Sequence, residues 1–171
     1  MAETYQWAQS HGVGPTVIDL GEDGNLFNFK DIDDATAANY SSNPITASDA
    51  ANEGRSYEVW LRAHFAGTFN KIDNIQFWMS TDFSPATGLT VYWGGNNVTW
   101  AQAVKTDSTK AAGSVPTSDP GTANVSIGGS LSGNLSAAGY SDYICLQLDV
   151  ATTAASGDSS LAVFSLQYDV S

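Results

Sequence analysis

The sequence predicts an all-β protein, a single antiparallel β-sandwich of jelly-roll type, from two observations. Apolar and polar side chains alternate with a period of two in several short runs, as they do when successive side chains of a strand point to opposite faces of a sheet. Clusters of Gly, Pro, Asn and Ser separate these runs, and no segment keeps the 3.6-residue period of an amphipathic helix. We therefore expect many short strands and less than about a tenth of the chain in helices.

The clearest strands lie within residues 56–80. The first run, 57–65, alternates apolar and polar residues, and the second run, 74–79, does the same. A short connection that contains glycine, residues 66–71, separates the two runs. This pattern is typical of an antiparallel hairpin, which we place at the centre of the sandwich.

Weaker or shorter strands are expected elsewhere in the chain, at 17–20, 26–29, 89–93, 98–100, 143–150 and 161–170. Two of them carry apolar side chains that should share a buried face, namely Ile144, Leu146, Leu148 and Val150 in one, and Phe164, Leu166 and Tyr168 in the other.

Residues 1–45 differ from the rest, so we divide the chain into an N-terminal segment or arm with short strands, 1–45, and a β-sandwich domain, 46–171. The segment is too small for a core of its own, yet it holds the apolar residues Tyr5, Trp7, Val17, Ile18, Leu20, Phe27 and Phe29. These side chains must pack either over a neighbouring subunit or onto the outer strands of their own sandwich.

Composition limits the function classes. At 171 residues the chain fits one domain. It has 18 Asp and Glu against 6 Lys and Arg, a formal net charge of -12, which predicts no binding to nucleic acid or to anionic membrane surfaces. The first ten residues do not have the pattern of a secretory signal peptide, and no run of 18 apolar residues occurs, so we expect neither export nor a membrane span.

Catalytic residues are not apparent. His11 and His64 are the only histidines, and the single cysteine, Cys145, lies in an apolar alternating run typical of a small core residue. His64 falls on the polar face of its strand and is expected at the surface or rim. Glu53 and Glu58 could supply a carboxylate pair for glycan hydrolysis, but nothing in the sequence sets their separation.

We also expect no metal and no cofactor. Residues 19–24 copy the start of an EF-hand calcium loop, but the twelfth position, where a bidentate Glu belongs, is Lys30. A solvated turn is therefore the preferred interpretation of this loop.

Four aromatic residues are candidate contacts with a partner: Tyr5, Trp7, Trp60 and Trp78. Trp60 and Trp78 fall on the more polar faces of their strands, and exposed aromatics favour a binding surface. With Trp93 and Trp100 they could instead form a sugar-stacking platform. Protein is the favoured partner, and sugar is the alternative.

Three phrases of the sequence resemble poorly characterised proteins that recur among the virion structural genes of tailed phages and other viruses. They are YEVWLR at 57–62 running into HFAGTFNKI at 64–72, PTSDPG at 116–121, and GYSDYI at 139–144. The resemblance covers roughly residue 43 to the C-terminus and carries over no functional residues.

The resemblance implies a capsid decoration (cementing) protein that is made in the host cytoplasm, binds the outer surface of the virion and has the major capsid protein as its partner. We expect a homo-oligomer, with a trimer as its form. An acidic surface suits such a particle protein because it keeps particles dispersed. The alternatives are a carbohydrate-binding β-sandwich module, an adhesin or tail-fibre component, and, least favoured, a glycan-active enzyme.

Overall fold

The computed structural model describes residues 3–14, 16–21, 27–34, 41–47, 54–96, 98–127, 135–157 and 160–171. These residues form nine strands: β1 (Thr4–His11), β2 (Thr16–Gly21), β3 (Val59–Ala66), β4 (Ile72–Thr81), β5 (Leu89–Gly94), β6 (Gly113–Ser114), β7 (Gly139–Tyr140), β8 (Ile144–Val150) and β9 (Val163–Val170). None of the described residues lies in a helix. The prediction of an all-β chain is confirmed.

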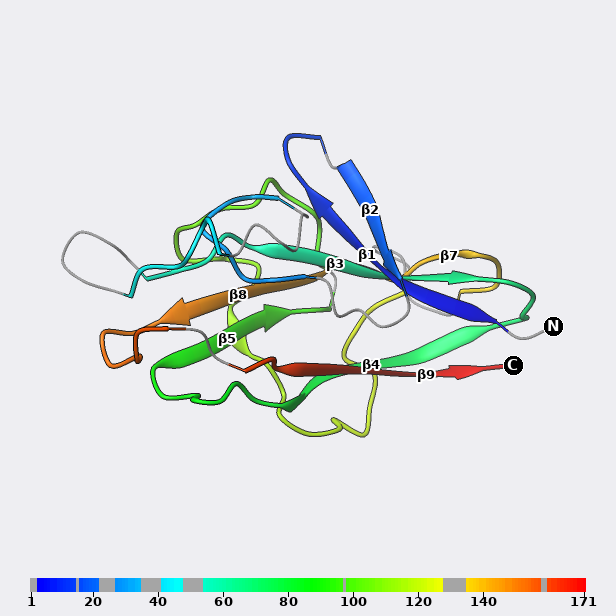
Figure 1. The fold of residues 1–171 in the computed structure, drawn as a ribbon. Coiled ribbons are helices and arrows are strands. Elements are labelled where there is room, and N and C mark those ends of the chain that lie inside the picture. Colours follow the sequence, from blue (N-terminus) through cyan, green and yellow to red (C-terminus); the bar gives the residue numbers. More distant parts are fainter. Residues whose placement is uncertain are drawn as a thin grey trace.

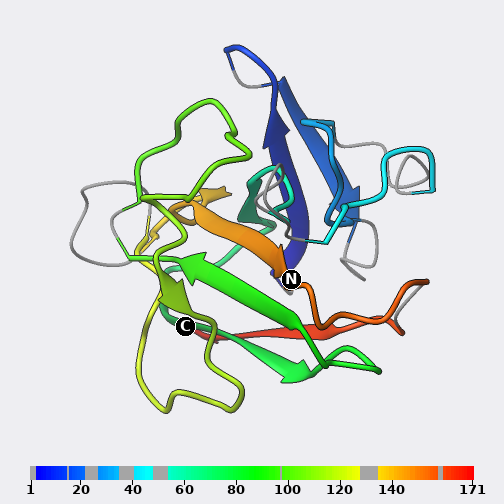
Figure 2. The same cartoon turned by 90° about the vertical axis from the view of Figure 1, so that its left-hand side faces the viewer.

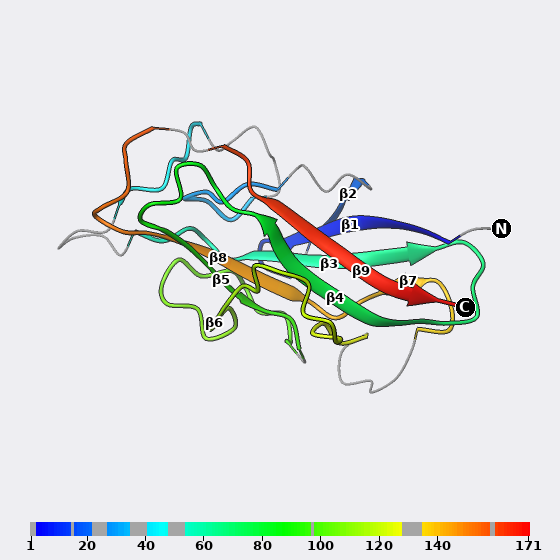
Figure 3. The same cartoon turned by 90° about the horizontal axis from the view of Figure 1, so that it is seen from below.

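The strands form two antiparallel sheets that pack face to face, as Figure 1 shows. The large sheet has seven strands in the order β2-β1-β3-β8-β5-β6, with β7 also paired to β3. The small sheet has two strands, β4 and β9, which lie across one face of the large sheet in Figures 1 and 3. The predicted β-sandwich is therefore confirmed, with its strands divided seven and two.

The core between the sheets is built from the apolar faces that the sequence predicts. In β8 the inward side chains Ile144, Leu146, Leu148 and Val150 are all buried. In β4 the predicted inward side chains Ile75, Phe77 and Met79 are buried, and Ile72 and Gln76 are buried as well. Phe164, Leu166 and Tyr168 of β9 are partly buried and pack against this core. Alternation with a period of two thus located the inner faces correctly.

The predicted hairpin of residues 56–80 is wrong, although both of its strands exist. β3 belongs to the large sheet, whereas β4 pairs with β9 in the small sheet. The connection at residues 67–71 therefore crosses from one sheet to the other. This arrangement lets the apolar faces of β3 and β4 meet across the core, whereas a hairpin would place both strands in the same sheet.

Two further strand predictions are corrected. Residues 27–29 of the expected strand at 26–29 have no strand pairing, and residue 26 lies outside the described residues. Residues 98–100 form no strand either. They begin a long irregular segment, 98–111, that lies on the side of β8 opposite to the small sheet (Figure 2). The large sheet is therefore covered on both faces around Trp60 and Cys145.

Candidate functional site

Tyr5 and Trp7 lie on the face of β1 that points into the sandwich. Trp7 is 5% exposed, and its ring packs edge-on against Phe77 of β4 with 6.0 Å between the ring centroids. The ring of Tyr5 lies 5.8 Å from that of Tyr168 in β9. β1 also pairs with β3 along residues 4–10. These aromatics hold β1 to its own domain, so this part of the N-terminal segment completes the sandwich, and Trp7 is not available to a partner.

Trp60 is also buried, with 0% exposure, so the expectation that it lies on a wet face is wrong. It points away from the small sheet into a second apolar cluster made with Val98, Ala103, Ala111 and Cys145. Its Nε1–H donates to Glu58 Oε2 over 3.2 Å. The face of β3 that carries Trp60 is dry because the irregular segment 98–111 covers it.

Two buried polar side chains fasten this segment to the sheet. Glu58 accepts hydrogen bonds from Ser108 Oγ (2.5 Å) and from the backbone N–H of Val104 (3.3 Å). Gln147 Nε2 donates to the carbonyl oxygens of Ser56 (3.0 Å) and Thr106 (2.9 Å). Buried polar groups are tolerated only when such partners satisfy them. Glu58 is thus a structural anchor, and its burial removes it from the surface where a glycan substrate would bind.

The tryptophans expected to form a sugar-stacking platform do not share one surface. Trp93 points to the inner core and stacks on Phe77, with 5.9 Å between ring centroids. Trp60 and Trp100 belong to the outer cluster on the opposite face of the large sheet. Trp78 lies half-buried on β4 of the small sheet. Of the four candidate contacts, Trp78 and Tyr5 keep partial exposure.

Cys145 is a core residue, as the sequence predicts. The thiol is fully buried beside Trp60, and burial together with the nearby Glu58 carboxylate raises its pKa far above the ordinary value. A thiol becomes a nucleophile as the thiolate, so this shift makes Cys145 inert in the folded protein.

The calcium-like loop at residues 19–24 lies partly outside the described residues: Asp19 and Gly21 are in β2, and 22–24 are not described. Lys30 is 3% exposed, and its Nζ donates to the carbonyl oxygen of Asp34 over 2.7 Å. Burial lowers the Lys30 pKa, against the opposing effects of Asp34 and Asp33. Within the described ranges, no three His, Cys, Asp or Glu side chains gather into a metal-binding group.

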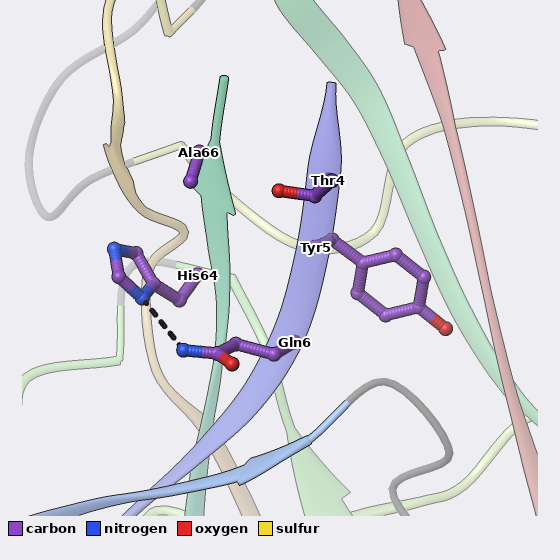
Figure 4. A pocket seen from close by; sticks show the side chains of 5 residues that line it. All are labelled: Thr4, Tyr5, Gln6, His64 and Ala66. Carbon is purple, nitrogen blue, oxygen red and sulfur yellow. Dashed lines mark hydrogen bonds between the residues drawn. The ribbon is translucent and has the colours of Figure 1, made fainter. Parts of the chain in front are cut away.

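A shallow cleft of about 130 Å³ lies on the outer face of the large sheet, lined by Thr4, Tyr5, Gln6, His64 and Ala66. Figure 4 shows the imidazole of His64 facing the Gln6 amide, while Tyr5 points to the opposite side of β1. Gln6 Nε2 donates to His64 Nδ1 over 3.3 Å. Small-molecule sites usually measure roughly 300–1,000 Å³, so this cleft is too small for one.

His64 is held in place by stacked neighbours. Its ring stacks on Tyr140 of β7 at 4.2 Å between centroids, and Arg62 Cζ lies 4.8 Å from the centroid of the same Tyr140 ring. Arg62 also lies 4.6 Å from the ring centroid of Tyr143. Such cation–π and stacking contacts join the irregular turn between β7 and β8 to β3. His64 is thus a rim residue with a structural role, as its position on the strand predicts.

Three exposed apolar side chains of the described residues lie on the β1–β2 hairpin, which projects from the sandwich in Figures 1 and 2. Val13 in its loop is 83% exposed, and Val17 and Ile18 in β2 are 45% and 40% exposed. We call these three residues the hairpin patch. Val17 and Ile18 belong to the apolar set that the sequence singled out. Val13 was missed because a lone valine in a Gly-rich turn gives no periodic signal.

Comparison with known proteins leaves the chain without relatives: no family model, curated protein or solved structure matches it. In the described part of the chain there is no helix that is long and apolar enough to span a membrane. The function must therefore be inferred from the phrases at 57–72, 116–121 and 139–144 and from the surface of the molecule.

Proposed function

We propose that this chain is a virion structural protein, a capsid decoration (cementing) protein that binds the outer surface of a capsid lattice and stabilises it. Its partner is the major capsid protein, and it acts on the virion after synthesis in the host cytoplasm, as a homo-oligomer such as a trimer. The phrases at 57–72, 116–121 and 139–144 support the assignment to virion structural proteins. The hairpin patch supports a docking role.

The observation that carries the proposal is the exposure of the hairpin patch. Val13, Val17 and Ile18 are neighbours on one projecting element, whereas the exposed apolar residues of the β9 region are separated. Leu161 and Val163 lie at one end of β9 and Val170 lies at the other. Apolar side chains that stay exposed on both faces of a projecting edge strand favour a contact with another protein.

The expected affinity suits a repeating lattice. Burying each of the three side chains contributes on the order of 1 kcal/mol, so a single contact is weak. Many copies, linked as oligomers and bound around one particle, would convert that weak contact into stable attachment. The net charge of -12 keeps decorated particles apart in solution.

Co-sedimentation tests the proposal directly. The purified chain is mixed with capsids of the encoding virus that lack it, and bound protein is measured after centrifugation. A triple variant of the hairpin patch, Val13→Ser, Val17→Ser and Ile18→Ser, should stay in the supernatant. A matched control, Leu161→Ser, Val163→Ser and Val170→Ser, removes as many exposed apolar side chains from the β9 region and should bind like the unmodified chain.

Two results would overturn the proposal. If the unmodified chain does not co-sediment with capsids, it is not a decoration protein. If the chain binds but only the β9 control variant loses binding, then the docking surface is on the small sheet and not on the hairpin.

A further inference from the structure

Among the residues that the structure describes, β2 is the last strand at one edge of the large sheet. It pairs with β1 on one side through residues 16–21. On its other side, no backbone hydrogen bond reaches it from any of the residues that the structure describes. In an antiparallel strand, neighbouring residues direct their N–H and C=O groups to alternate sides, so about half of these groups in β2 point outward to solvent. Such an edge can accept a further strand.

The register defines the side chains that an added strand would meet. Val17 lies opposite Ser10, which in turn lies opposite Trp60, so Val17 is on the outer face of the large sheet. Asp19 lies opposite Ala8, which in turn lies opposite Arg62, so Asp19 is also on the outer face. Ile18 is on the inner face. The edge thus presents an apolar residue and a carboxylate on one face and an apolar residue on the other.

The charge around this edge is negative. The side chain of Asp19 is 48% exposed, and its Oδ1 lies 3.9 Å from His64 Nδ1. At the other end of the hairpin, Asp33 Oδ2 accepts a hydrogen bond from the backbone N–H of Gly12 over 2.9 Å. Lys30 interacts with Asp33 from a buried position, so Asp19 is the exposed carboxylate in β2 itself. A Lys or Arg opposite Asp19 in an added strand would form a favourable cross-strand charge pair.

A second copy of the chain is a poor occupant of the edge. Two copies that meet through β2 would bring together surfaces that each carry a net charge of -12. Their contact would be limited to two strands of six residues, and a stable dimer usually needs about 1,200–2,000 Å² of buried surface. A short strand contact suits a partner that presents many sites on a lattice.

We propose that β2 binds its partner by strand addition: an extended capsid segment pairs antiparallel to β2, with apolar residues opposite Val17 and Ile18 and a Lys or Arg opposite Asp19. This inference rests on the proposed decoration function and specifies how the partner is recognised. Main-chain hydrogen bonds supply the register, Val17 and Ile18 supply apolar pairs, and Asp19 selects for a basic residue.

Proline substitutions at adjacent positions test the main-chain contact. Val17 and Ile18 direct their N–H groups to opposite sides of β2. One of the two proline variants, Val17→Pro or Ile18→Pro, therefore loses an N–H that points outward, and the other loses an N–H that bonds to β1. Amide hydrogen exchange on the unmodified chain decides which is which. The outward proline should lower affinity for capsids by about tenfold or more, since it removes a donor and blocks strand pairing, while the melting temperature stays close to that of the unmodified chain.

Asp19→Lys tests the charge and leaves the backbone intact. It should lower capsid affinity several-fold at low salt, and added salt should narrow its difference from the unmodified chain. The triple serine variant of the hairpin patch separates this inference from the decoration function. If that variant loses binding while the outward proline and Asp19→Lys both bind normally, the chain docks through side chains alone and strand addition is wrong. If no capsid binding occurs with the unmodified chain, the decoration function fails, and strand addition to a capsid segment fails with it.

Discussion

The outer face of the large sheet and the β1–β2 hairpin differ in what covers their side chains. On the outer face, Glu58 and Trp60 look like surface residues by their polar neighbours, yet both are buried under the segment 98–111. On the hairpin, Val17 and Ile18 look like core residues, yet both are exposed because β2 is the last strand of its sheet. The alternating pattern predicted an exposed Trp60, whereas for Val17 and Ile18 the sequence left open whether they pack on their own sandwich or on a neighbouring subunit.

The difference shows that tertiary cover, and not side-chain polarity alone, decides burial in this sandwich. A carboxylate can be buried when donors surround it, as Ser108, Val104 and Trp60 surround Glu58. An apolar strand at a sheet edge stays exposed unless another element covers it. The hairpin therefore exposes apolar side chains, whereas the tryptophan of β3 belongs to the core of the protein.

The largest effect is expected from Trp60→Ala. Removing a fully buried indole should cost about 3–5 kcal/mol of unfolding free energy, because it leaves a cavity beneath the segment 98–111. Trp78→Ala is the matched control, since Trp78 is half-buried and should cost clearly less. Urea denaturation measures both. Equal losses in the two variants would contradict the burial of Trp60.

Glu58→Gln should cost about 1–3 kcal/mol, because an NH₂ group then replaces one of two oxygens that both accept hydrogen bonds. Urea denaturation measures the loss of unfolding free energy, and the rate of proteolytic cleavage within residues 98–111 measures how firmly this segment is attached. Unchanged stability and unchanged cleavage would show that Glu58 does not anchor the segment.

Cys145 gives a smaller, pH-dependent effect. Its pKa is raised in the folded state, so above about pH 9 the unfolded chain loses a proton that the folded chain keeps. Stability contributed by this group therefore falls as the pH rises through that range, by at most about 1.4 kcal/mol per pH unit. Subtracting the pH profile of Cys145→Ala isolates this contribution. Identical slopes in the two proteins, or rapid labelling of the native thiol, would contradict a buried Cys145.

The smallest effect on stability is expected on the hairpin. Because its side chains are exposed, replacing the three residues of the hairpin patch by Ser should change the unfolding free energy by no more than about 0.5 kcal/mol per site. Thermal unfolding provides the measurement. A loss of several kcal/mol would mean that the patch packs against its own domain and is not free for a partner.

The sequence predicted the inner half of this fold well. The alternation in β3, β4 and β8 located their core faces because these faces pack into the shared core between the two sheets. The crossing from one sheet to the other between β3 and β4 was not predictable, because a short connection that contains glycine is compatible with either a hairpin or such a crossing.

The sequence also did not predict that the segment 98–111 covers the outer face of the large sheet. The segment 98–111 has no periodic pattern, and its attachment depends on Glu58 and Gln147, which are distant in sequence and polar in type. For the candidate contacts, Trp7 and Trp60 were misassigned because aromatic residues are as common in cores as at interfaces. Val17 and Ile18 were selected by their apolar character, and the structure adds that they remain exposed.

Amide hydrogen exchange of the free chain tests the central contrast most directly. The backbone N–H groups of Val104 and Ser108 donate to the buried side chains of Glu58 and Gln147, and that of Ala111 donates to Ser108 Oγ, so all three should exchange slowly although their segment has no regular structure. Of Val17 and Ile18, the residue whose N–H points away from β1 should exchange rapidly although it lies in a strand. Fast exchange throughout 98–111, together with slow exchange of both β2 amides, would contradict the account of a covered outer face and an open hairpin edge.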